Sequence, residues 1–211
     1  MSRRPVAYIT GMAGFAGSWL AEELLSDGFT VIGTALKGEA TENLRNVQHE
    51  VSLERLDVLK PDQCARQVSR VKPDYIFHLA AVASVGKSFA AERLTLQVNF
   101  EGTVNMLEAA RGSRRLKRFV FVSSADCYGR FTPKNKTLTE AQPLNPISPY
   151  GIGKAAAEQA ARYYCRSHGL PVVVARSFNH TGPRQAPDFV VPAFARQVAR
   201  IEAGKQRPVL R

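Results

Sequence analysis

The chain has 211 residues, of which 45% are hydrophobic, so it is long enough for one α/β domain and part of a second. The net charge of +11 raises the question of nucleic-acid binding, but the basic residues are scattered and RNA-binding signatures are missing. There is no signal-peptide pattern or membrane-spanning apolar run, and the three cysteines fit neither a disulfide nor a metal pattern. We therefore expect a cytoplasmic protein that binds no metal, membrane or nucleic acid.

A glycine-rich turn near the N-terminus is the first candidate binding element. The apolar run Val6–Ile9 predicts a buried strand, and apolar residues at helical spacing over Ser18–Leu25 predict a helix. Between them lie Gly11, Gly14 and Gly17. This arrangement brings backbone N–H groups and the positive end of a helix dipole to one point, which suits a pyrophosphate. The spacing is one residue wider than G-x-G-x-x-G, and close helix–strand packing remains the alternative explanation of the glycines.

The next two strands carry residues expected beside the adenosine of a dinucleotide. Thr30–Ala35 predicts the second strand, whose end is where an acid would accept the ribose hydroxyls of NAD. No acid is present there, and Lys37 follows, so NADP(H) is favoured over NAD(H) unless Lys37 is only a solvated loop residue. Val51–Leu56 predicts a third strand, and Asp57 after it can accept from the adenine amino group.

Strands and helices continue to alternate. Pro61–Val71 predicts a helix, and Tyr75–Leu79 a fourth strand that ends in two alanines. Residues 84–88 are expected to form a polar loop, Arg93–Ala110 a long helix and Phe119–Ser123 a fifth strand. This alternation predicts an α/β fold with a doubly wound parallel sheet. Ligands of such sheets lie at the carboxyl ends of the strands, which are the expected positions of Gly11, Asp57, Ala80 and Ser124.

Tyr150 and Lys154 are the candidates for acid–base chemistry. Both lie at the start of an expected helix that runs to Tyr164, and residues four apart share a helix face. An ammonium group near a phenol lowers the pKa of the phenol and makes it a usable proton donor and acceptor near neutral pH. Tyr-x-x-x-Lys is frequent by chance, but with the glycine turn and a strand-end serine it indicates an oxidoreductase.

The chain resembles the extended short-chain dehydrogenase/reductase family of nucleotide-sugar epimerases, dehydratases and reductases, which have a Rossmann fold. The matching motifs run in the family's order over nearly the whole chain: Thr10–Leu20, Asp57–Val58, His78–Ala81, Asn99–Asn105, Ser123–Gly129, Tyr150–Lys154 and Arg176–Pro183. The resemblance implies that Tyr150 is the acid/base, that Lys154 orients the nicotinamide ribose and that Ser124 hydrogen-bonds the reacting sugar oxygen.

The resemblance, with the reasoning above, also assigns binding residues. Cofactor contacts are expected from Gly11, Gly14, Phe15, Ala16, Gly17, Lys37, Asp57, Val58, Leu79, Ala80, Ala81, Asn99, Tyr150, Lys154 and Phe178. Contacts with a nucleotide-sugar substrate are expected from Ser84, Ser124, Asp126 and Asn179.

The reaction is harder to assign than the family. Asp126 stands where family dehydratases carry an acidic base, usually glutamate, although Ala125 beside it offers no second acid and family reductases can also carry an acid here. Phe178–Gln185, followed by Phe189–Pro192, is most similar to GDP-4-keto-6-deoxy-mannose reductases. We therefore expect reduction of a 4-keto sugar, and a nucleotide-sugar 4,6-dehydratase or 4-epimerase is the alternative.

Family members continue beyond the equivalent of the last residue of this chain. We expect residues 1–175 to form a dinucleotide-binding domain and residues 176–211 to begin a substrate-binding lobe that is incomplete, and we expect a homodimer.

Two other classes of protein remain as alternatives. A non-catalytic dinucleotide-binding regulator would keep the glycine turn, but the presence of Ser124, Tyr150 and Lys154 argues against it. A nucleic-acid-binding protein is suggested only by the charge. The densest basic cluster, at residues 111–118, follows an expected helix and is interpreted as a solvated helix end, although positive charge would also suit an anionic substrate.

Overall fold

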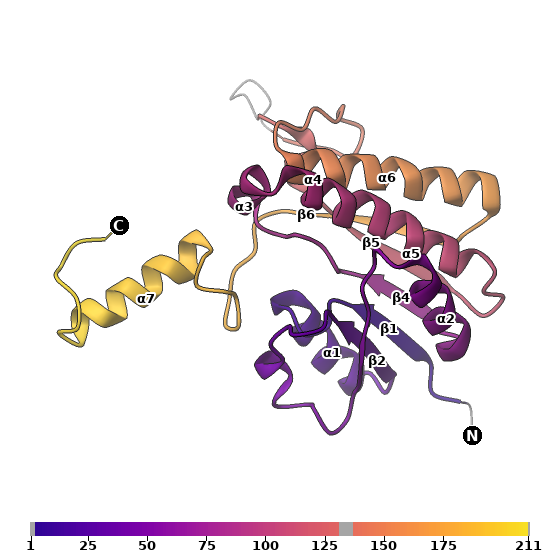
Figure 1. The fold of residues 1–211 in the computed structure, drawn as a ribbon, viewed down its shortest axis with the longest axis horizontal. Helices are drawn as coiled ribbons and strands as arrows, with labels where there is room; N and C mark the ends of the chain where they lie inside the picture. The colour runs from indigo at the N-terminus through magenta and orange to yellow at the C-terminus, as the bar shows by residue number, and fades with distance from the viewer. Residues whose placement is uncertain (1–2, 131–136, 211) are drawn as a thin grey trace. The chain divides into compact units, whose positions relative to one another are not determined.

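The computed structural model describes residues 3–130 and 137–210, and its strands form one parallel sheet (Figure 1). The strands in chain order are β1 (Val6–Thr10), β2 (Thr30–Ala35), β3 (Ser52–Arg55), β4 (Tyr75–His78), β5 (Arg118–Ser124) and β6 (Val172–Ser177). Their order in the sheet is β3-β2-β1-β4-β5-β6, so the chain direction across the sheet reverses between β1 and β4. This confirms the predicted doubly wound sheet, whose ligand crevice lies at that reversal.

The helices connect the parallel strands. They are α1 (Phe15–Ser26), α2 (Pro61–Val71), α3 (Val85–Ala90), α4 (Glu92–Leu96), α5 (Gly102–Arg111), α6 (Pro149–His168) and α7 (Val190–Glu202). Shorter turns are the 3₁₀ segments η1 (Glu42–Leu44) and η3 (Ala125–Tyr128) and the π-helical segment η2 (Gln97–Glu101). Helix α1 packs on one face of the sheet, whereas α2, α5 and α6 cover the other (Figure 1).

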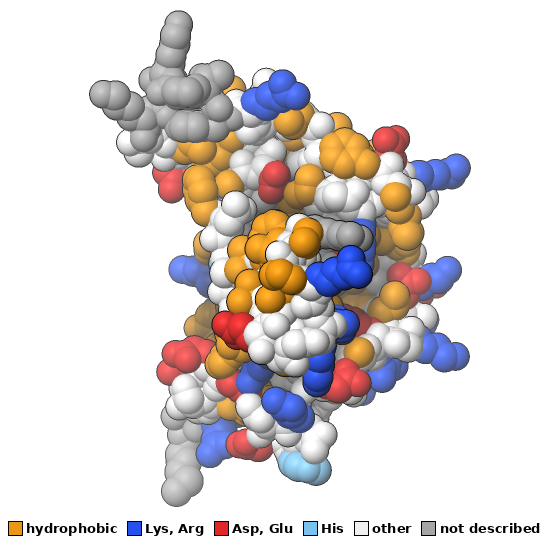
Figure 2. All heavy atoms as spheres, turned by 90° about the vertical axis from the view of Figure 1, so that its left-hand side faces the viewer, with side chains coloured by type: hydrophobic (Ala, Val, Ile, Leu, Met, Phe, Trp, Pro, Cys, Tyr) orange, Lys and Arg blue, Asp and Glu red, His pale blue; other side chains and the backbone are white. Residues whose placement is uncertain are grey.

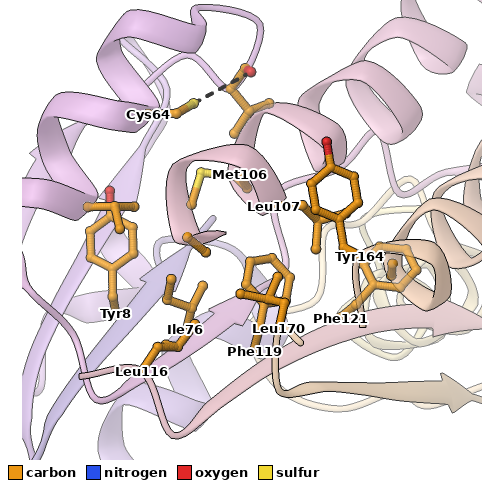
Figure 3. Close-up of a cluster of buried hydrophobic side chains, with 14 of the residues drawn as sticks. Tyr8, Cys64, Ile76, Met106, Leu107, Leu116, Phe119, Phe121, Tyr164 and Leu170 are labelled. Carbon is orange, nitrogen blue, oxygen red and sulfur yellow. Dashed lines mark hydrogen bonds between the residues drawn. The ribbon is translucent and has the colours of Figure 1, made fainter. Parts of the chain in front are cut away.

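Alternation along the strands divides the core into two layers. Tyr8 on β1 joins the cluster under α2, α5 and α6, whereas its neighbours Ala7 and Ile9 join the cluster under α1. Figure 3 shows the first cluster, in which strand residues such as Ile76 and Phe119 lie against Met106 and Leu107 of α5. Because both faces are covered, the strands are apolar enough to hold their carboxyl ends in a fixed arrangement.

The expected elements are present, with two corrections. β2 and α2 have the predicted bounds, and β3 is shorter at both ends. The expected loop at 84–88 is wrong, because Ser84 caps a short helix, α3, by accepting a hydrogen bond from the Lys87 backbone N–H at 3.3 Å. The expected single helix Arg93–Ala110 is interrupted by the π-helical segment η2.

The chain divides into two compact units, Met1–Phe178 and Asn179–Arg211. The boundary expected after residue 175 lies inside β6, three residues before this division. On the face drawn in Figure 2, Lys and Arg side chains occupy several separate places with Asp and Glu between them. Within 3–130 and 137–210, every helix is too short or too polar to span a bilayer.

Candidate active site

The glycine turn joins β1 to α1 at the carboxyl edge of the sheet. Gly11 has a φ of +70°, and a Cβ there would lie 3.0 Å from the Ala80 backbone nitrogen. A Cβ at Gly17 would lie 2.4 Å from the Gly11 carbonyl oxygen, so this glycine lets the helix pack on the turn. At Gly14 the only neighbour within 4 Å is the Gly11 carbonyl oxygen at 3.3 Å. Gly14 is therefore the glycine whose open side faces away from the protein's own packing.

The same turn is suited to an anion. Gly14 is the N-cap of α1 and provides no side-chain cap for the first turn, which contains Phe15, Ala16 and Gly17. The N–H groups of a first helical turn have no partner inside the helix and carry the positive end of its dipole. Because a side chain at position 14 would fill the approach to these groups, the turn fits a pyrophosphate.

The residues expected beside adenosine lie at the ends of β2 and β3. Lys37 is exposed and follows β2, and Asp57 is half-buried after β3. One carboxylate oxygen of Asp57, Oδ1, accepts from the Leu59 N–H at 2.9 Å. Val58 is buried, and its carbonyl accepts from the Asn105 side chain at 2.8 Å. The end of β3 is thus held rigidly, with Asp57 at the carboxyl edge.

A buried histidine, which the sequence analysis did not assign a role, ties β1 to β4. Thr10 Oγ1 accepts from the N–H groups of Leu79 and Ala80, both at 3.2 Å, so its own proton points to His78 Nδ1 at 2.8 Å. His78 Nε2 then donates to Thr103 Oγ1 at 3.1 Å, and Thr103 donates to the Asn99 carbonyl at 2.7 Å. Burial lowers the pKa of His78 to about 3, with a smaller effect from Lys154, so this chain of hydrogen bonds is neutral.

The loop after β4 is held from the other side by Asn99. Its side-chain oxygen accepts from the Val82 N–H at 2.8 Å and its amide donates to the Val82 carbonyl at 3.2 Å. Asn99 is 1% exposed, so its side chain supports the Leu79–Ala81 backbone, where a cofactor was expected to lie. Leu79, Ala80 and Ala81 are themselves half-buried.

Ser124, Asp126 and Tyr150 converge at the end of β5. Ser124 Oγ donates to Asp126 Oδ2 at 3.0 Å and accepts from the Asp126 N–H at 3.1 Å. Tyr150, in the first turn of α6, is also hydrogen-bonded to Ser124. Ser148 caps α6 by accepting from the Gly151 N–H at 3.0 Å, which sets the entry of the helix beside β5. The predicted pair of a strand-end serine and a helical tyrosine is thus brought into contact.

Lys154 is not turned toward Tyr150. Its Nζ donates to the Val122 carbonyl at 2.7 Å and lies 5.2 Å from the centre of the Phe121 ring. Burial lowers the pKa of Lys154 to about 8. Burial raises the pKa of Tyr150, the hydrogen bond with Ser124 lowers it, and Asp126 and Cys127 raise it, so that the sum is an increase. The expectation that Lys154 lowers the pKa of Tyr150 is therefore wrong for this structure.

The other expected substrate and cofactor residues are more scattered. Ser84 caps α3, and Phe178 is 59% exposed at the end of the first unit. Asn179 begins the second unit and is exposed.

A buried ionic network beneath the site was missed from the sequence. Glu158 is fully buried, accepts from Ser123 Oγ at 3.0 Å and is paired with Arg162 and Arg176 at 2.9 and 2.5 Å. These ion pairs hold the pKa of the Glu158 carboxyl below its usual value despite its burial. Its position four residues after Lys154, on the same helix face, was the signal available in the sequence. The network links β5, α6 and β6 directly behind Ser124.

A parallel sheet in this order, with a glycine turn after its first strand and a strand-end serine bonded to the tyrosine of a Tyr-x-x-x-Lys helix, defines a short-chain dehydrogenase/reductase with a Rossmann fold. The sequence model of the GDP-mannose 4,6 dehydratase family matches residues 8–210. The chain belongs to this family.

Individual relatives have different activities. The chain is 33% identical over 199 residues to a GDP-6-deoxy-D-mannose reductase of Pseudomonas aeruginosa, covering 94% of this chain and 60% of that protein. It is 36% identical over 182 residues to a UDP-glucose 4-epimerase of Mycolicibacterium smegmatis, covering 85% and 57%. The chain thus spans about 60% of the length of these relatives.

Solved structures support the same fold. A UDP-glucose 4-epimerase of Thermus thermophilus in complex with NAD superposes with a TM-score of 0.84 at 33% identity, covering 94% of this chain and 63% of that one. A dTDP-glucose 4,6-dehydratase of Streptomyces venezuelae with NAD bound has a TM-score of 0.84 at 31% identity, covering 94% and 62%.

Proposed function

We propose that this chain is the cofactor-binding part of an NAD(P)-dependent oxidoreductase that acts on C4 of a nucleotide-sugar, and that the reaction is reduction of GDP-4-keto-6-deoxy-mannose. The observation that carries the proposal is the contact of Tyr150 with Ser124 and Asp126 at the carboxyl edge of the sheet. The resemblance of residues 178–192 to GDP-4-keto-6-deoxy-mannose reductases and the similarity to the Pseudomonas aeruginosa reductase support this choice of reaction.

The residues present suit a reduction. A bound nicotinamide cofactor would supply the hydride. A ketone that accepts a hydride at C4 develops negative charge on its oxygen, and this charge must be met by a proton donor. Burial and the Asp126 carboxylate raise the pKa of Tyr150, so the phenol keeps its proton at neutral pH and can donate it to that oxygen. Lys154, buried beside β5, is proposed to hold the nicotinamide ribose.

The alternative activities remain open on the same residues. A 4,6-dehydratase would use Asp126 as the base that removes the C5 proton, and a 4-epimerase would use Tyr150 first as base and then as acid. Ala125 provides no second acid beside Asp126, which favours the reductase over the dehydratase.

Cofactor choice and assembly complete the proposal. NADP(H) is preferred over NAD(H), because the end of β2 lacks an acid and Lys37 is exposed after it. The protein is proposed to be a homodimer, supported by exposed apolar side chains on the adjoining helices α4 and α6, among them Leu94, Ile152 and Tyr163. The buried free thiols of Cys64 and Cys127 favour a reducing, cytoplasmic location.

The decisive experiment removes the Tyr150 proton in a protein that also carries the substrate lobe. Tyr150→Phe keeps the ring, so cofactor affinity should stay within about twofold while turnover of the 4-keto sugar falls by roughly 10²–10⁴-fold. NADPH oxidation gives the rate, and mass spectrometry identifies the product formed from GDP- and dTDP-sugars. Lys154→Met is the companion variant and should weaken both binding and turnover. A Tyr150→Phe protein with the parental rate would exclude the assigned role.

A further inference from the structure

A hollow of about 570 Å³ lies beside the carboxyl ends of β2 and β3, and three of its lining residues are basic. Lys37 follows β2, Arg55 is the last residue of β3, and Arg66 lies on α2. They come from three separate elements, so the sequence analysis recognised only Lys37. Strand pairing places Arg55 directly beside Ala35, the last residue of β2.

The three basic side chains have no carboxylate partner among the described residues. Lys37, Arg55 and Arg66 are all exposed, and Arg55 Nη1 donates to the Leu36 carbonyl at 2.9 Å. This bond fixes the guanidinium beside the backbone that leads into Lys37, and the remaining N–H groups of Arg55 can face the hollow. The next arginine of α2, Arg70, is different, because it is paired with Glu54.

The position of the hollow indicates its ligand. In a doubly wound sheet the end of β2 lies beside the adenosine ribose of a bound dinucleotide. The acidic residue that lines the hollow, Asp57, has Oδ1 bonded to the Leu59 N–H. A phosphomonoester on the ribose would therefore meet an excess of positive charge, and arginine binds phosphate oxygens through two parallel N–H groups.

We propose that Arg55 and Arg66, together with Lys37, form the binding site for the adenosine 2′-phosphate of NADP(H), with Arg55 as the principal determinant of cofactor choice. The proposal rests on the nicotinamide cofactor named above and deepens it. Lys37 by itself accounts for only a several-fold preference, since an exposed lysine–phosphate contact is weak. Arg55, positioned by the Leu36 carbonyl, adds a directed contact of higher strength.

The test is a binding measurement on the 211-residue chain, so turnover is not needed. NADPH and NADH are titrated by fluorescence against the parent, Arg55→Ser, Arg66→Ser and the matched control Arg70→Ser. Arg55→Ser should weaken NADPH about tenfold or more and Arg66→Ser about threefold, while NADH changes less than twofold. Arg70→Ser removes an arginine from the same helix and should leave the ratio of the two affinities unchanged. Thermal unfolding of each variant shows whether the fold is kept.

Fragments distinguish the 2′-phosphate from any other anion. Adenosine 2′,5′-bisphosphate should compete with NADPH more strongly than 5′-AMP, and this advantage should disappear in Arg55→Ser. Competition by inorganic phosphate alone that matches the bisphosphate would overturn the proposal, as would an equal loss of NADPH and NADH in Arg55→Ser. A parent chain that binds neither dinucleotide would instead refute the proposed cofactor-binding function. A parent that prefers NADH would refute both the proposed cofactor choice and this site.

Discussion

The single hydroxyl proton of Ser124 is already used in this structure. Because Ser124 donates to Asp126, its hydrogen bond with Tyr150 leaves Tyr150 as the donor and Ser124 as the acceptor. The sequence analysis expected Ser124 to hydrogen-bond the sugar oxygen, which requires Ser124 to release Asp126 when substrate binds. At the scale of one residue, Asp126 thus decides where two protons point, and this fits a phenol that begins the reaction protonated.

Asp126→Asn should shift the pH dependence of a reductase rather than abolish its activity. The Asp126 carboxylate raises the pKa of Tyr150, so its removal lowers that pKa. The protonated phenol exists below its pKa, and the alkaline limb of the kcat profile for 4-keto reduction should therefore move to lower pH, by about one unit or less. The profile is measured by NADPH oxidation in a protein with the substrate lobe. A loss of more than about 10³-fold at every pH would instead indicate the C5 base of a dehydratase.

At the scale of elements, the three glycines of the first turn have different roles. Gly17 lies so close to the turn that any Cβ clashes with backbone, whereas a Cβ at Gly14 meets one oxygen at 3.3 Å. Only the second position therefore allows a side chain to be placed in the cofactor's path while the strand, turn and helix stay in place.

Gly14→Val should weaken binding of both NADPH and NADH by about tenfold or more, because the side chain displaces the pyrophosphate from the start of α1. The melting temperature should fall by only a few degrees, since replacing an N-cap glycine costs about 1 kcal/mol. Gly17→Ala provides the contrast and should lose both stability and binding. Normal cofactor affinity in Gly14→Val would place the phosphates elsewhere.

The interrupted helix shows the limit of periodicity at this scale. Apolar spacing over Arg93–Ala110 predicts one continuous helix, yet the π-helical segment η2 lies within it. The segment contains Asn99, which holds Val82, and Thr103 follows it at the end of the His78 hydrogen-bond chain. These bonds join residues distant in sequence, and they are satisfied by a local change of helical pitch that side-chain periodicity does not encode.

At the scale of the whole molecule, the proposed homodimer is tested by its apolar surface. Leu94 is 50% exposed on α4, so Leu94→Glu should convert the dimer to a monomer without changing the far-UV circular dichroism. Val209→Glu is the control, because Val209 is equally accessible (53%) but lies in the second unit. Light scattering after size exclusion gives the mass. A monomeric parent chain would contradict the proposal.

The sequence by itself determined the order of strands and helices, the bounds of β2 and α2, the glycine turn and the family, because turn chemistry and hydrophobic periodicity act over neighbouring residues. Only the tertiary structure decided that Arg55 and Arg66 join Lys37, that Ser124 donates to Asp126, and that Lys154 bonds the Val122 carbonyl. The first depends on which strands become neighbours in the sheet. The other two depend on which acceptor a buried donor meets, and the donor must meet one because leaving it unpaired costs several kcal/mol.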